Sequence, residues 1–269
     1  MTSAFRRGGL SLVLFCVLSI LATEVQSAGP TITVEPARAA KLRELISNAN
    51  QSLERLGDYR VRMRRREIVG EKTCHEDLAM LTIRCKPFAV HVKCLTGSEN
   101  EGREIIYLAG QHEEMFQVLT GKGDVLAGMR MDVAVNSLMV TSNCRRGLNE
   151  AGFSNMMQRF GLAVDRYLAG QGHASEFEPL GLQTRAESRA PMEVVLQRIP
   201  AGEEPLLQHG GIRYWHFNAD ADAAERHLPT LVITFDDKGQ EVEYYLHDRL
   251  IPKVSLEARD FNADKIWSK

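Results

Sequence analysis

The sequence has no excess of charge of either sign, few cysteines and only one long apolar run. Its 33 basic and 35 acidic residues give a net charge of −2, so composition offers no basic surface of the kind that binds nucleic acid. The apolar run lies at the N-terminus, and no second run is long enough to span a bilayer. The spacing of the five cysteines does not match a zinc site built from two close pairs. We therefore expect neither nucleic acid nor a metal as a partner.

Motifs of the common enzymes are also missing. The chain contains no G-x-S-x-G nucleophile elbow, no phosphate-cradling loop and no H-E-x-x-H helix. These absences argue against the hydrolases and nucleotide enzymes that short sequence motifs identify most easily. We expect no cofactor and no catalytic site. The alternative is an envelope hydrolase with dispersed residues, for which the candidates are His216 and either Asp220 or Asp222.

The N-terminal run predicts export. Two arginines precede the apolar stretch 10–21, and small and polar residues follow up to Ser27. A positive start, a short apolar core and small residues at the exit are typical of a secretory signal peptide. We expect residues 1–27 to be removed by cleavage after Ser27, which leaves a single domain, 28–269, in the periplasm or cell envelope. An uncleaved N-terminal anchor is the alternative.

Export would place the cysteines in an oxidising compartment. Four of them remain after cleavage, so one or two disulfides are predicted, and spacing does not choose among the three pairings of two bridges. The alternative is that some of these side chains are small buried apolar groups. The candidates are Cys74, Cys85, Cys94 and Cys144.

Hydrophobic periodicity predicts two helices. The first helix begins at Pro36. Proline is tolerated there because the backbone N–H groups of the first turn have no hydrogen-bond partners within the helix, so the N–H that proline lacks is not needed. Apolar residues at three- and four-residue steps continue to Gly57, which ends it. The second helix extends from Phe153 to Leu168 and is followed by Gly170. Its methionine-rich stripe is typical of core packing.

Elsewhere the period of the apolar residues changes to two, which predicts strands. Short turns separate strands about ten residues apart, as in an antiparallel meander. Residues 120–150 stay ambiguous because glycines interrupt their strand-like patches. The order helix, meander, helix, meander predicts one α+β domain with helices packed on a large antiparallel sheet. The strands are expected at 59–69, 78–84, 88–95, 103–109, 114–119, 192–199, 212–217, 231–235 and 242–246.

Residues 228–248, LPTLVITFDDKGQEVEYYLHD, form the clearest predicted hairpin. Asp236 and Asp237 sit side by side at its tip, between two alternating runs. Asp and Gly are residues that tight turns require. Two carboxylates on a solvated loop also lack the burial that would raise a pKa for acid–base work. We interpret the pair as a turn and not as a catalytic site.

Four arginines alternate along the first predicted strand and therefore share one face. One interpretation is the solvated face of a half-buried sheet. The other is an anion-binding surface for phosphate or lipid head groups. These candidate ligand-binding residues are Arg60, Arg62, Arg64 and Arg66.

Two further polar clusters are interpreted as loops. His112, Glu113 and Glu114 are adjacent, so their side chains point apart and suit a solvated turn better than a metal site. The segment 218–226 has acids at alternate positions, as calcium loops do, but the required glycine is replaced by Ala223.

Short motifs along the chain resemble a family of exported bacterial proteins known only as a domain of unknown function. That family is similar to the outer-membrane lipoprotein carriers of the LolA/LolB type, and the resemblance covers about residues 40–262. It implies a large curved antiparallel sheet or incomplete β-barrel, whose concave face is covered by an N-terminal amphipathic helix and a second helix. It also implies an apolar cavity for acyl chains. The motifs are KPFAVHVKCL (86–95), GREIIYLAG (102–110), AGFSNMMQRF (151–160), the hairpin 228–248 and LEARDF (256–261).

The resemblance further implies that an arginine on an early strand hydrogen-bonds the helical lid, but the four alternating arginines compete for this role. The stretch 129–144 departs from the family pattern.

The sequence as a whole favours a non-catalytic binding protein of the cell envelope. The expected ligand is a lipid, an acyl chain or a lipoprotein held in an apolar cavity. The alternatives are the hydrolase named above and a structural module that contacts a partner through its sheet edges or the arginine row. The sequence does not predict the oligomeric state.

Overall fold

The computed structural model describes residues 34–69, 72–98, 100–141, 144–171 and 173–268, with the side chains of 72–75 and 141 left aside. Residues Thr31–Lys269 form one compact unit. The predicted signal peptide, 1–27, lies outside the described residues.

The described chain forms one sheet of eleven strands, in the spatial order β6-β5-β4-β3-β2-β1-β11-β10-β9-β8-β7. Every neighbouring pair is antiparallel. Two meanders, β1–β6 and β7–β11, are joined where β1 pairs with β11. The strands are β1 (Tyr59–Val69), β2 (Lys72–Arg84), β3 (Ala89–Cys94), β4 (Glu104–Leu108), β5 (Met115–Leu119), β6 (Arg130–Ala134), β7 (Glu176–Gln183), β8 (Met192–Ile199), β9 (Gly211–Asn218), β10 (Pro229–Asp236) and β11 (Glu241–Ile251).

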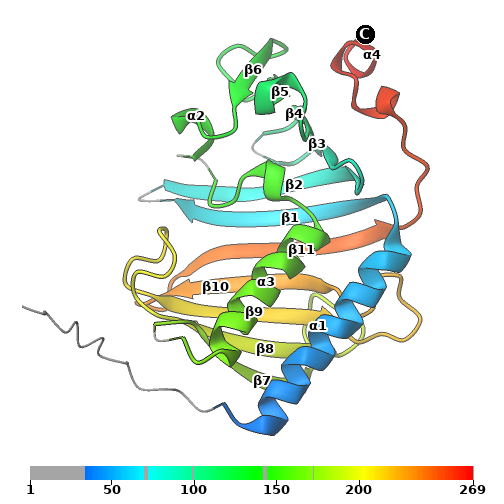
Figure 1. Ribbon diagram of the computed structural model, residues 1–269. Helices are drawn as coiled ribbons and strands as arrows, with labels where there is room; N and C mark the ends of the chain where they lie inside the picture. The colour runs from blue at the N-terminus through cyan, green and yellow to red at the C-terminus, as the bar shows by residue number, and fades with distance from the viewer. Residues whose placement is uncertain (1–33, 70–71, 99, 142–143, 172, 269) are drawn as a thin grey trace, which may run out of the picture. The chain divides into compact units, whose positions relative to one another are not determined.

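The sheet is curved and does not close, since β6 and β7 are its two edges. The two long helices cross the same, concave face of the sheet (Figure 1). The α+β class, the large curved antiparallel sheet and the two covering helices are thus confirmed. The helices are α1 (Pro36–Leu56), α2 (Leu138–Thr141), α3 (Phe153–Leu168) and α4 (Ala263–Ile266), and short 3-10 turns lie at His112–Glu114, Leu148–Glu150 and Ala258–Phe261.

The structure corrects the predicted elements in three places. Strand β2 begins at Lys72 and not at 78, because acids such as Asp77 mask its alternation. The ambiguous region 120–150 contains β6 and α2. Strand β7 was not predicted because Pro179 interrupts its sequence. A proline is tolerated there because β7 is an edge strand, and the β7–β8 register shifts just after it.

The interpretation of the hairpin tip as a turn is confirmed. The Asp236 carboxylate accepts hydrogen bonds from the backbone N–H groups of Lys238 (2.9 Å) and Gln240 (2.8 Å). Gly239 supplies the positive φ of 77° that the turn needs. The acid therefore closes the β10–β11 connection and faces solvent.

One contact fixes the start of α3 against the sheet. The Phe153 N–H donates a hydrogen bond of 2.9 Å to the hydroxyl of Tyr59 on β1. The preceding Gly152 has a φ of 93°, and a Cβ on it would lie 2.6 Å from that hydroxyl oxygen. Only glycine fits both the conformation and the space. The position of α3 over β1 therefore depends on Gly152.

Phe160 anchors the middle of α3 in the main core. Its side chain is fully buried. Its ring lies 5.6 Å from that of Phe177, 5.2 Å from Trp215 and 5.3 Å from Phe217, with edge-to-face geometry. Aromatic pairs at these distances stabilise the fold by more than the burial of their apolar area alone.

We predict that Phe160→Ala lowers the free energy of unfolding by about 3–5 kcal/mol, because it leaves a cavity among three aromatic rings. Urea denaturation followed by circular dichroism measures the change. Leu162→Ala, two residues further on the exposed side of α3, should change it by less than about 0.5 kcal/mol. Equal effects of the two substitutions would contradict this account of the core.

Candidate functional site

Two neighbouring cavities lie on the concave face of the sheet. The larger, of about 660 Å³, lies over β4, β5 and β6 beside α2. The smaller, of about 230 Å³, lies beneath α3. Arg65 of β1 and Leu148 of the segment before α3 line both cavities. These two residues therefore mark the boundary between them.

The larger cavity has a mostly apolar wall. The polar side chains at its end are already paired: Asp77 accepts from Arg65 (2.7 Å) and from Asn100 (2.9 and 3.0 Å). Arg103 pairs with Asp124. The remaining surface is therefore suited to an apolar ligand. The apolar residues of the wall include Ile105, Phe116, Val118, Leu126, Met131, Val133 and Val140.

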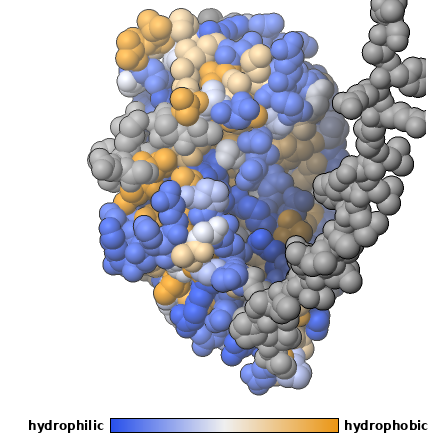
Figure 2. All heavy atoms as spheres, turned by 60° about the vertical axis from the view of Figure 1, so that its left-hand side comes forward, coloured by the Kyte–Doolittle hydropathy of each residue, from blue (hydrophilic) through white to orange (hydrophobic). Residues whose placement is uncertain are grey.

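The rim of the larger cavity exposes apolar side chains. Of the residues that line it, Val125 is fully exposed and Met139 is 61% exposed, and Leu126 is also exposed. Met129 and Leu138, close to them in the sequence, are exposed as well. Figure 2 shows hydrophobic atoms gathered at the top of the molecule, the part that carries β5, β6 and α2 in Figure 1. Isolated exposed apolar residues are ordinary, but a cluster of them beside a cavity is typical of a binding site.

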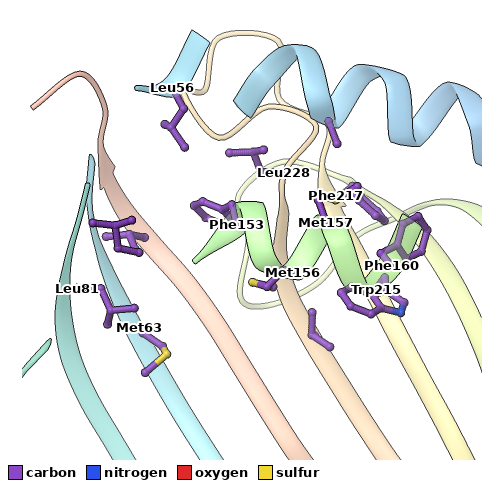
Figure 3. Packing of buried hydrophobic residues seen from close by; sticks show 14 of the residues in the cluster. Leu56, Met63, Leu81, Phe153, Met156, Met157, Phe160, Trp215, Phe217 and Leu228 are labelled. Carbon is purple, nitrogen blue, oxygen red and sulfur yellow. The ribbon is translucent and has the colours of Figure 1, made fainter. Parts of the chain in front are cut away.

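The smaller cavity is apolar at one end. Met63 and Leu81 reach it from β1 and β2, Met156 reaches it from α3, and Trp215 reaches it from β9. Figure 3 shows Met63 and Leu81 projecting from their strands and Met156 and Trp215 lying beneath the helix. The Trp215 indole N–H donates to Gln197 (2.8 Å).

The other end of the smaller cavity holds a buried network of charges. Arg213 contacts Glu204 through both of its terminal nitrogens (2.6 and 2.9 Å) and Glu243 through one of them (2.9 Å). Arg146 contacts Glu204 (2.8 Å) and Glu243 (3.3 Å). Burial by itself would raise the pKa of Glu204, but Arg213 and Arg146 outweigh it and lower that pKa to about 2. Both glutamates are therefore ionised and held by arginines.

Arg159 projects from α3 over this charged end. Its terminal nitrogen lies 3.1 Å from Glu150, which is 53% exposed. Burial, together with the neighbouring charges of Arg146 and Arg213, lowers the pKa of Arg159 to about 10. The guanidinium still carries its charge at neutral pH, in surroundings where positive charge is in excess.

His247 of β11 also lines the smaller cavity. The side chain is buried, its ring lies 5.3 Å from that of Phe153, and its Nδ1 has no hydrogen-bond partner among the described residues. Burial lowers the pKa of His247 to about 4, although Asp248 opposes the shift. The ring is therefore neutral at physiological pH.

The predicted arginine row lies on the other face of β1. Met63 and Arg65 point to the cavities, so Arg62, Arg64 and Arg66 point to the convex side. Arg62 pairs with Asp248 (2.7 and 2.6 Å), Arg64 with Glu76 (3.2 Å), and Arg66 with Glu76 and Glu241. Arg60 is exposed. An anion-binding role for the row stays a prediction.

The sequence alone did not identify the arginines that line the smaller cavity, which are Arg65, Arg146, Arg159, Arg166 and Arg213. Only Arg65 could have been assigned to the inner face of the sheet from the sequence, because it lies two residues from Met63 on a half-buried strand and therefore shares its face. Arg146 and Arg213 are far apart in the sequence and become neighbours only in the folded chain.

Of the predicted disulfide cysteines, Cys85 and Cys94 are free thiols. Burial raises the pKa of Cys94 to about 11. The Sγ atom of Cys144 lies 3.1 Å from the Val140 carbonyl oxygen. The side chain of Cys74 lies outside the described residues. The pairing of any disulfide stays a prediction.

The hydrolase candidates are not brought together. His216 is buried, with its Nδ1 lying 3.3 Å from the Leu231 carbonyl oxygen. Among the described residues no hydrogen bond joins this ring to Asp220 or Asp222. Asp220 instead accepts a hydrogen bond from the Asp222 N–H (3.0 Å), as a local turn does.

Among all the residues that the structure describes, no cluster of histidine, cysteine and acidic residues could hold a metal ion. No helix that the structure describes is long and apolar enough to cross a bilayer.

The chain folds as an open antiparallel sheet with helices and two cavities on its concave face. It belongs to the family described as protein of unknown function (DUF1571), whose model matches residues 56–265. The resemblance to a family of unknown function is thus confirmed. No curated protein matches the chain.

Similar solved structures share little sequence with the chain. An uncharacterized conserved protein of Thermus thermophilus is 9% identical, with a TM-score of 0.45, and the match covers 81% of this chain and 91% of the other. The lipoprotein LppX of Mycobacterium tuberculosis is 12% identical, with a TM-score of 0.45 and coverages of 81% and 99%. A LolA superfamily protein of Nitrosomonas europaea is 12% identical, with a TM-score of 0.36 and coverages of 83% and 98%. At these values no ligand is carried over to this chain.

We predict that His247→Phe reduces the loss of stability on acidification. The pKa of His247 falls from an ordinary 6.5 to about 4 on folding, so the unfolded chain takes up the proton first. Its contribution is present above pH 6.5 and is lost as the pH falls through 4, by roughly 3 kcal/mol in total. Urea denaturation of wild type and variant across this range measures the difference.

The exposed His209 provides the control, since His209→Phe should keep the wild-type slope. A comparison between wild type and variants is needed because Glu67 changes the stability of the fold with pH in the opposite direction to His247. Burial raises the pKa of Glu67 to about 6, so its contribution is present at low pH and is lost as the pH rises through 6. Parallel curves for wild type and His247→Phe would contradict the prediction.

Proposed function

We propose that the protein is a non-catalytic binding protein of the cell envelope that holds the acyl chain of a lipid or lipoprotein in the larger cavity. The observation that carries this proposal is the apolar-walled cavity of about 660 Å³ with an exposed apolar rim. Its volume falls within the roughly 300–1,000 Å³ of typical small-molecule sites. Pockets of this type are mainly apolar, with few polar groups to orient the ligand.

The pairing of the polar groups at the cavity end supports a passive role. Asp77 is held between Arg65 and Asn100, and Asp124 is held by Arg103. The hydrogen bond from Arg103 lowers the pKa of Asp124, so this carboxylate stays ionised at neutral pH. Such a carboxylate is a poor general acid, and an arginine is not a base. The cavity thus offers surface for an apolar chain.

The rim supports transfer of the ligand to or from an apolar environment. Val125, Leu126 and Met139 line the larger cavity and are exposed to solvent. Their burial against a membrane or a lipoprotein would be favourable at about 25 cal/mol per Å² of apolar area. Export, predicted from the N-terminal run, would place the protein where such ligands occur.

We predict that Val118→Trp weakens the binding of an uncharged acyl lipid. Val118 is a partly exposed residue of β5 in the cavity wall, so the indole would occupy part of the cavity. Binding is measured by displacement of the neutral fluorophore N-phenylnaphthylamine with monopalmitoylglycerol. The affinity should fall at least about tenfold, since loss of one or two buried apolar groups corresponds to 1.5–3 kcal/mol, as a rough value.

Leu182→Trp is the matched control, because Leu182 is an exposed apolar residue of the edge strand β7 and is not part of the cavity wall. This variant should bind as wild type does. The proposal would be overturned if wild type failed to bind monopalmitoylglycerol, or if Val118→Trp bound it with unchanged affinity.

A further inference from the structure

The smaller cavity differs from the larger in the charge of its wall. Five arginines and four glutamates line it, which leaves an excess of one positive charge. Glu204 and Glu243 are each contacted by both Arg146 and Arg213. The carboxylates at this end are thus already occupied by guanidinium groups. A cationic ligand would find no free acid there.

Arg159 has unused donor capacity. A guanidinium carries five N–H donors, and the ion pair of Arg159 joins one terminal nitrogen to Glu150 at the rim of the cavity. The neighbouring charges of Arg146 and Arg213 disfavour its positive charge. An anion placed between Arg159 and Arg146 would accept hydrogen bonds from the one and relieve the repulsion between the two.

His247 is an independent observation at the same cavity. Its buried side chain lines the wall, and its Nδ1 is an unpaired polar atom among the described residues. A buried nitrogen without a partner is destabilising. A polar ligand, or water held with it, would satisfy this atom.

The apolar end limits the rest of the ligand. Met63, Leu81, Met156 and Trp215, labelled in Figure 3, form the apolar part of the wall of this cavity, which the arginines also line. The volume of about 230 Å³ exceeds the roughly 150 Å³ of an apolar cavity that accepts benzene. It lies below the usual range for larger ligands. The tail is therefore short, or leaves through the opening.

We infer that the smaller cavity is a binding site for a single-chain anionic amphiphile. Its carboxylate or phosphate lies between Arg159 and Arg146, and its apolar tail lies against Met156 and Trp215. The inference concerns a different cavity from the one assigned to the acyl lipid above and does not depend on that assignment. It gives the concave face two sites of different chemistry, separated by Arg65 and Leu148.

Four eight-carbon probes that differ in their head groups test the inference by isothermal titration calorimetry on the full domain. They are octanoate, octyl phosphate, octanol and octyltrimethylammonium. Octanoate, octyl phosphate or both should bind about ten- to a hundredfold more tightly than octanol, as expected for charge-assisted hydrogen bonds. The comparison of the two anions distinguishes a carboxylate from a phosphate source. The cationic probe should not bind.

Arg159→Gln should remove most of the preference for the anions and lower their affinity at least about tenfold. Arg198→Gln is the matched control, because Arg198 on β8 has a similar ion pair of 3.0 Å with Glu178 and lies outside the cavity. That variant should bind as wild type does. A shared far-ultraviolet circular dichroism spectrum and melting curve would show that both variants are folded.

The inference would be overturned if octanoate and octyl phosphate bound no better than octanol, or if Arg159→Gln bound them as wild type does. Loss of anion binding in Val118→Trp, with full binding in Arg159→Gln, would place the amphiphile in the larger cavity and would equally overturn it. Failure of monopalmitoylglycerol to bind would overturn the proposed function alone, since that lipid carries no anionic group.

Discussion

The pairing of β1 with β11 is the contact on which the rest of the structure depends. It joins two meanders into one sheet, and it brings residues of β1 next to residues of β11 on the concave face. Glu67 faces Glu243 in this register, and Arg65 faces Tyr245. Two buried carboxylates opposite each other would repel, so arginines must accompany them. The cavities lie on either side of this charged seam.

Arginines of the segment before α3 and of β9 supply that compensation. The Arg145 guanidinium lies 3.4 Å from Glu243 and donates to the carbonyl oxygens of Ile68 (2.7 Å) and Leu206 (2.5 Å). Its backbone N–H also donates to Glu67 (3.3 Å). Removal of one member would leave a buried charge unpaired, which is strongly destabilising. The charges therefore hold the segment that divides the concave face into an apolar cavity and a mixed one.

Local patterns in the sequence predicted the fold well because strands and helices bury alternate faces and stripes. Pro36, Gly57 and the aspartate-glycine turn of the hairpin act through local backbone chemistry and could be read directly. The edge strand β7 was missed because an edge tolerates Pro179, which a central strand would not. The site was harder to predict. The prominent arginine row proved to be the outer face of β1, whereas Arg159 and Arg213 become neighbours only through the packing of α3 on the sheet.

An unclosed sheet leaves two edges at which another sheet could add a strand, and both edges bear features that disfavour such growth. On β7, Pro179 offers no N–H, and the nearby register shift bends the strand. On β6, the strand is only five residues long and carries Arg130 and Asp132. Short, charged or interrupted edges resist edge-to-edge aggregation. The domain can therefore keep an accessible concave face, although its sheet does not close.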